Sequence, residues 1–321
     1  MKEANFLRYD PRLLEEAVFL AVKDRPQADI YHGERSRVYD IQEPQEREEG
    51  FRTVNQQWFF SLGLHVAIER ALEEQPAISS GVKFCVVARA AGKNEEGAEL
   101  FVNSAKTIDP NDRRTARILL RPESLLAQAE LLIFLRQELF HVTDMLNPDF
   151  GYEPFLPPAE GGPAHDSLLR ERYKVLWETA IAGRMVRRGW LSESVRAEHL
   201  SRFRRVFPIF GQETETVFSG FFDSETHTHA DFINLASAPG AAVEHTTEGP
   251  QPGSRCSLCG FPTHAFETQP ENLGSSVIAE IRRDFPHWRT IDALCIQCAD
   301  IYRACAVATS SSQPLPGNLL L

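Results

Sequence analysis

Apolar residues recur at helical spacing in several segments of the N-terminal part of the chain. Residues 11–22 and 54–73 predict two helices, and the second places Trp58, His65 and Leu72 near one face. Short runs rich in Val, Ile, Leu and Phe predict three strands. These strands cover residues 83–88, 99–102 and 114–120.

Two longer amphipathic segments follow the predicted strands. After a turn at residues 121–124, the pattern predicts a long helix over residues 125–146. A second helix is predicted over residues 166–188, with Gly189 as its stop signal. Strands first and main helices afterwards are typical of an α+β domain, which is the fold class that we expect.

Composition divides the chain. Residues 236–254 are rich in Gly, Pro and small polar residues without apolar periodicity, which predicts a flexible linker. It separates an α+β domain at residues 1–235 from a small module at residues 255–308. The tail at residues 309–321 has a similar composition and is expected to be disordered. Helical spacing over residues 272–284 predicts a helix inside the module.

Two Cys-x-x-Cys pairs carry the clearest chemical signal. Four thiolates in two such pairs are the ligand set of a tetrahedral structural zinc. The start of the chain is charged and does not resemble a signal peptide, so we expect reduced thiols and a cytoplasmic protein rather than two disulfides. A zinc ribbon-like module with a helical insert is predicted. Its ligands are Cys256, Cys259, Cys295 and Cys298.

Two further cysteines lie outside these pairs. Cys85 belongs to an apolar run, where a thiol behaves as a small buried hydrophobe. We expect Cys305 to face the core of a closing helix, with a role as substitute zinc ligand as the alternative. His264 and His287 lie close in sequence to the pairs, but four thiolates already complete a zinc site.

Charge and hydropathy exclude some classes of function. The 321-residue chain has a formal net charge of -11, and residues 256–309 contain four Arg, no Lys and six Asp or Glu. Nucleic acid is therefore an unlikely partner, and a protein or peptide partner fits better. No apolar run approaches the roughly 20 residues that span a membrane.

The long predicted helix contains a second motif, since residues 137–141 read Gln-Glu-Leu-Phe-His. The motif, the strand before it and Glu178 on the following helix resemble a zincin metallopeptidase of the type that takes a glutamate as third zinc ligand. The resemblance covers residues 114–183 and implies Glu138 as the general base, with His141 and Glu178 as ligands of a second divalent metal. Asp144, one turn beyond His141, is an alternative ligand.

One position departs from the zincin pattern. Gln137 stands where the family has its first histidine ligand, and a carboxamide binds zinc poorly compared with imidazole. The sequence thus leaves several hypotheses open. They are a catalytically impaired zincin-like protein, an active site with a different metal or ligand set, and a domain without zincin relation. In function, the alternative to a metal-dependent peptidase is a non-catalytic zinc-binding scaffold or protein-interaction protein.

Two competing metal constellations are weaker. Glu138 and His141 also form half of a di-iron motif, but none of the other histidines has a glutamate three positions earlier. Residues 223–229 contain Asp223, Glu225, His227 and His229. The simpler interpretation of this segment is that Thr228 caps a helix that begins near His229 and that both histidines are solvated.

Overall fold

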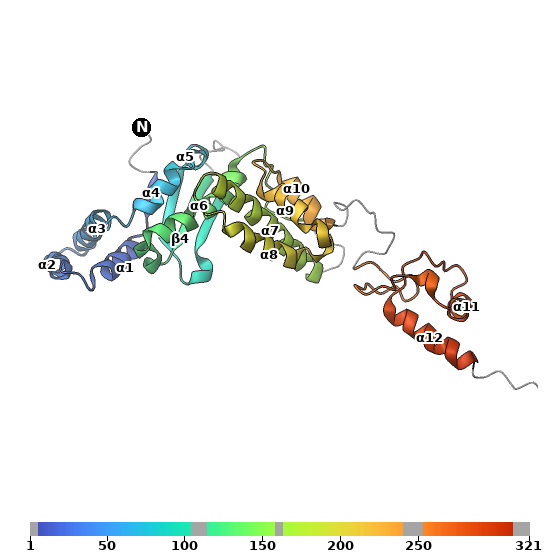
Figure 1. The fold of residues 1–321 in the computed structure, drawn as a ribbon. Helices are drawn as coiled ribbons and strands as arrows, with labels where there is room; N and C mark the ends of the chain where they lie inside the picture. Colours follow the sequence, from blue (N-terminus) through green and yellow to red (C-terminus); the bar gives the residue numbers. More distant parts are fainter. Residues whose placement is uncertain (1–5, 104–113, 158–162, 240–252, 311–321) are drawn as a thin grey trace, which may run out of the picture. The chain divides into compact units, whose positions relative to one another are not determined.

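The computed structural model describes residues 6–103, 114–157, 163–239 and 253–310 (Figure 1). The chain divides into two compact units, Met1–Ser237 and Ala238–Leu321. The division falls inside the predicted linker, although a helix occupies the first two linker positions. Residues 240–252, the greater part of that linker, lie outside the described residues.

A four-stranded sheet organises the first unit. Its strands are β1 (Leu7–Tyr9), β2 (Phe84–Arg89), β3 (Gly97–Val102) and β4 (Arg114–Leu120). Their order is β1-β2-β4-β3, with β1, β2 and β4 parallel and β3 antiparallel to β4. The three predicted strands are confirmed, whereas β1 was not predicted. β1 and β3 are the two edges of the sheet.

Alternation along the strands builds the core of this unit. Ala116, Ile118 and Leu120 of β4 are buried, and Cys85 and Val87 of β2 are fully buried beside them. The expected burial of Cys85 is confirmed, and burial raises the pKa of its thiol to about 12. Helices packed on these strands complete a hydrophobic cluster that extends from Leu13 to Leu146.

Five helices lie between β1 and β2 in the sequence. They are α1 (Pro11–Val22), α2 (Ala28–Val38), α3 (Pro44–Ser61), α4 (Val66–Glu73) and α5 (Pro76–Gly81). The predicted bounds of α1 are confirmed, and Asp10 caps it by accepting a hydrogen bond from Arg12 N–H.

The single helix predicted over residues 54–73 was wrong. The chain breaks at Gly63, whose φ of 71° lies in the left-handed region. Gly63 N–H donates to Phe60 C=O and Leu64 N–H donates to Phe59 C=O, which is a Schellman termination of α3. A periodic apolar face therefore continues across two helices, α3 and α4, instead of one.

Longer helices form the rest of the first unit. They are α6 (Gln128–Leu146), α7 (Pro163–Arg187), α8 (Val195–Val206), α9 (Thr214–Phe222) and α10 (His229–Ser237). The predicted long helix starts at Gln128 because a 3-10 helix, Pro122–Leu126, occupies its first turn. Further 3-10 turns cover Lys93–Glu95 and Pro208–Glu213. At Gly183 a Cβ would lie 1.7 Å from Phe222 O, so α7 and α9 pack backbone against backbone.

The second unit contains a 3-10 turn, Pro270–Asn272, and two helices, α11 (Ser275–Asp284) and α12 (Ile296–Ser310). α11 confirms the helix predicted inside the module. α12 continues through Ser310, so the predicted tail does not begin at residue 309, and residues 311–321 lie outside the described residues. Cys305 is exposed on α12, which corrects the expectation that it faces the core.

Helices and a four-stranded sheet together agree with the predicted α+β class. None of the helices in the described part of the chain combines the length and the apolar composition that crossing a bilayer requires.

Candidate functional site

The four predicted cysteine ligands come together in the second unit. The sulfur atoms of Cys256, Cys259, Cys295 and Cys298 all lie within 4.8 Å of one another, and Cys259 Sγ is 4.0 Å from Cys295 Sγ. In a tetrahedral site with Zn–S bonds of about 2.3 Å, neighbouring sulfurs are about 3.8 Å apart. The cluster therefore has the size that a zinc ion requires.

Local backbone structure positions the first cysteine pair. An antiparallel bridge joins Arg255 to Pro262 and closes a tight turn around Cys256 and Cys259. Gly260 directly follows the pair with a φ of 70°, and its N–H donates to Cys256 C=O. A residue with a side chain rarely adopts this left-handed conformation, so glycine permits the turn.

The second pair lies at the start of a helix. Cys295 immediately precedes α12, and Cys298 lies in the first turn. The two pairs thus differ in backbone structure, since the first lies in a turn closed by an antiparallel bridge and the second at a helix start. Backbone bonds hold the two pairs together, since Ser257 N–H donates to Ala293 C=O and Phe266 forms an antiparallel bridge with Cys295.

Backbone hydrogen bonds to sulfur stabilise the thiolate form of Cys256. Burial acts to raise the pKa of Cys256, but the backbone N–H groups of Cys259, Cys295 and Leu258 donate to its sulfur and lower the pKa to about 7. Burial raises the pKa of Cys298 and of Cys295. A cation among the sulfurs would favour the thiolate form of all four, so the donor set fits a metal ion such as zinc.

The motif on α6 lies beside the edge strand β3. Glu138 Oε2 accepts a hydrogen bond from Ala98 N–H at 3.4 Å, and a Cβ at Gly97 would lie 3.2 Å from the same oxygen. Burial raises the pKa of Glu138, the Ala98 hydrogen bond lowers it, and the nearby charge of Glu178 raises it again. Glu138 and Glu178, predicted as base and ligand, therefore influence each other electrostatically.

His141 lies on the same helix, against α7. Its ring packs edge-on against Trp177, with the centroids 4.5 Å apart. The pKa of His141 is lowered to about 4, mainly by burial. The negative charge of Asp144 acts to raise this pKa, and the positive charges of Arg184 and Lys174 act to lower it. The imidazole is therefore neutral near pH 7, which is the form that binds metals.

The other two predicted ligands, Glu178 and Asp144, form ion pairs with basic side chains. Arg202 of α8 donates from Nη1 to Glu178 Oε2, and Lys174 lies 3.8 Å from the other oxygen of Glu178. Asp144 is 5 % exposed and receives bonds of 2.7 and 2.6 Å from Arg184 and of 2.7 Å from Trp177 Nε1. Both carboxylates thus already have positively charged partners.

No second metal cluster is found within residues 6–103, 114–157, 163–239 and 253–310. In these residues, only one group of three or more His, Cys, Asp or Glu has its ligand atoms close enough together to hold a metal ion. This group is the four cysteines. Glu138, His141 and Glu178 do not form such a group, with or without Asp144. Their donor atoms as arranged do not fit a metal ion.

Residues 223–229 are also engaged in protein contacts. Asp223 pairs with Arg196, and Glu225 pairs with Arg187. The predicted cap is confirmed, because Thr228 Oγ1 accepts from the N–H of Asp231 at 3.1 Å.

The two histidines of this segment are not solvated, which corrects the expectation for them. His229 is 4 % exposed, and its Nδ1 lies 2.7 Å from the Tyr173 hydroxyl. His227 is partly buried and stacks on Phe221.

Comparisons with known proteins identify no relative of this chain. No protein-family model, no curated protein and no solved structure matches it.

Proposed function

We propose that the first unit is a zincin-related domain that has lost its catalytic metal, and that the protein is a non-catalytic zinc-binding scaffold for a protein or peptide partner. One observation carries this proposal: Arg202 and Lys174 contact the carboxylate of Glu178. A zincin of this type would have a metal ion there. Basic side chains that neutralise the acid remove the need for the metal and oppose its binding.

The order of the elements supports the zincin relation. β4 leads into α6 with Glu138 and His141, and the next helix, α7, brings Glu178 close enough to affect the pKa of Glu138. This is the order of strand, motif helix and acidic helix on which the resemblance rests. Gln137 and the paired acids account for the lost metal.

A partner has a candidate surface on β3. This strand is an edge of the sheet, and its side chains Phe101 and Val102 are 47 % and 64 % exposed. An extended peptide can add to such an edge through backbone hydrogen bonds, and exposed apolar side chains provide contacts for its side chains.

A metal-dependent peptidase is the second candidate. The observation in its favour is the raised pKa of Glu138, which suits a general base that works near neutral pH. In that case a second metal would bind near His141.

Metal analysis of the purified protein separates the two functions. The scaffold proposal predicts one zinc per chain, which is lost in the Cys256→Ser/Cys259→Ser variant and retained in His141→Ala and Glu178→Gln. A second metal that disappears in His141→Ala, together with cleavage of peptide substrates, would contradict the scaffold proposal and support the peptidase.

A gain-of-metal variant tests the zincin relation itself. Gln137→His restores the missing imidazole, and Arg202→Leu removes the cation that faces Glu178. We expect the double variant to bind a second zinc, whereas Arg202→Leu alone serves as the matched control and should bind one. A folded double variant that still binds a single zinc would count against zincin ancestry.

A further inference from the structure

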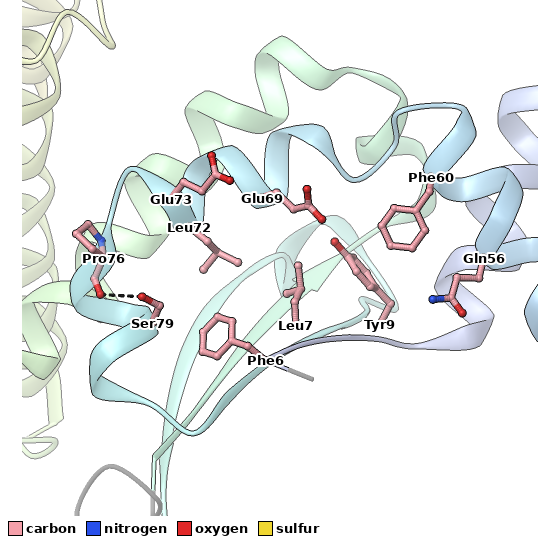
Figure 2. A pocket seen from close by; sticks show the side chains of 10 residues that line it. All are labelled: Phe6, Leu7, Tyr9, Gln56, Phe60, Glu69, Leu72, Glu73, Pro76 and Ser79. Atoms are coloured by element: carbon pink, nitrogen blue, oxygen red, sulfur yellow. Dashed lines mark hydrogen bonds between the residues drawn. The ribbon is translucent and has the colours of Figure 1, made fainter. Parts of the chain in front are cut away.

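A pocket of about 720 Å³ lies at the opposite edge of the sheet from β3. It is bounded by the edge strand β1 and by α3, α4 and α5 (Figure 2). Leu7, Phe60 and Leu72 contribute apolar surface to it. Its volume lies within the range of about 300–1,000 Å³ that is usual for small-molecule sites.

The charge of this pocket is negative. Glu69 and Glu73, one turn apart on α4, both line it, and no Lys, Arg or His is among the described residues that line it. Glu69 Oε2 lies 3.8 Å from His65 Nε2, and neither Glu69 nor Glu73 forms an ion pair with a Lys or Arg within the described part of the chain. Two carboxylates beside apolar walls favour a ligand with a positive charge on an apolar body.

A third polar group, the hydroxyl of Tyr9, is buried and has no hydrogen-bond partner among the described residues. Figure 2 shows this hydroxyl pointing toward Glu69. Burial, and after it the charge of Glu69, raise the pKa of Tyr9, so the phenol stays neutral. A buried hydroxyl without a partner destabilises the folded state, and a ligand that pairs with it would remove that cost.

We propose that this pocket binds a small primary amine whose ammonium group lies among Glu69, Glu73 and Tyr9 and whose apolar body lies against Leu7, Phe60 and Leu72. A primary ammonium has three N–H donors and no acceptor. The two carboxylates and the hydroxyl oxygen supply three acceptors. The inference is independent of the proposed scaffold function, since no residue of the pocket belongs to α6, α7 or β3.

Isothermal titration calorimetry of the full chain with hexylammonium chloride tests the proposal. We expect saturable binding of one hexylammonium per chain. The neutral analogue 1-hexanol should bind at least about tenfold more weakly, because hydrogen bonds to charged groups contribute about 1.5–3 kcal/mol. Hexanoate, with its negative charge, should not bind. Equal binding of hexylammonium and hexanol would overturn the proposal.

Variants locate the site. Glu69→Gln/Glu73→Gln keeps the side-chain shapes and should weaken hexylammonium binding by at least about tenfold, and Tyr9→Phe should weaken it severalfold. Glu46→Gln/Glu49→Gln on α3 makes the same change of net charge at exposed positions outside the pocket and should leave the affinity unchanged.

Two outcomes, one from the variants and one from a peptide ligand, would contradict the assignment of the pocket to a small amine. One is wild-type affinity in the double pocket variant, or in Glu69→Gln alone, with a native circular dichroism spectrum. The other concerns the source of the amine. If the peptide acetyl-Leu-Lys-Leu-amide bound more tightly than hexylammonium, a lysine side chain and not a small amine would be the ligand.

Discussion

The cysteine cluster of the second unit and the motif region of the first unit both contain side chains of types that can bind a metal, but in different surroundings. Around Cys256 the nearest groups are backbone N–H donors and other thiols, with no basic side chain bonded to a sulfur among the described residues. Around Glu178 and Asp144, arginines supply the positive charge. The comparison teaches that suitable ligand residues are not sufficient to form a metal site. The negative charge of the ligands must also not be neutralised by basic side chains of the protein.

The largest expected effect is the loss of the cysteine cluster. In Cys256→Ser/Cys259→Ser, or after chelation, we expect zinc release and unfolding of the second unit, because its core is small and structural zinc contributes about 10–16 kcal/mol. Metal analysis measures the zinc release, and limited proteolysis measures the unfolding. Cys305→Ser, an exposed thiol outside the cluster, is the control. Simultaneous unfolding of the first unit would refute the independence of the two units.

The next effect concerns the buried ion pair between Asp144 and Arg184. Asp144→Ala leaves Arg184 and the Trp177 indole without their buried partner, so the free energy of unfolding should fall by about 3–5 kcal/mol in urea titrations. Glu48→Ala removes an exposed ion pair with Arg52 and should cost less than about 1 kcal/mol. Equal effects of the two variants would mean that Asp144 has no structural role as a paired acid.

The smallest expected effect is the pH dependence that His141 introduces. Its imidazole takes up a proton near pH 6.5 in the unfolded chain but only near pH 4 in the folded protein. The unfolded state therefore binds more protons between these values, and the free energy of unfolding should fall as the pH falls from about 6.5 to about 4. The total change is at most about 3 kcal/mol.

His141→Phe isolates this contribution, because the other buried histidines remain in both proteins. The difference in unfolding free energy between variant and wild type, measured at several pH values, should change across the same window. The charged groups that act on His141 are Asp144, Arg184 and Lys174. A constant difference would show that His141 titrates normally, as a solvated imidazole does.

Local patterns predicted much of the fold. The bounds of α1 and β4 were predicted without error, because Pro11 marks the start of the first and the apolar residues 118–120, followed by a turn, mark the end of the second. The break at Gly63 was missed, because apolar periodicity alone does not reveal a left-handed glycine. β1 was missed because three residues are too short to show alternation.

In the candidate site, too, some contacts could be predicted from the sequence and others could not. The contact between Lys174 and Glu178 has the i, i+4 spacing of a helix and could have been found in the sequence. Arg202 and Arg184 gave no such signal, since each pairs with an acid on a different helix. Glu69 and Glu73 also share the i, i+4 spacing, but the pocket that they line exists only where α4 meets β1.

By itself, the amino-acid sequence indicated the four-cysteine cluster, because two cysteines three positions apart can bring their thiols together both in a tight turn and at the start of a helix. The tertiary structure alone decided which acids pair with Arg184 and Arg202 and that Glu69 and Glu73 line a pocket. Those partners come from segments far apart in the chain, and packing of the helices against the sheet sets the distances between their charges.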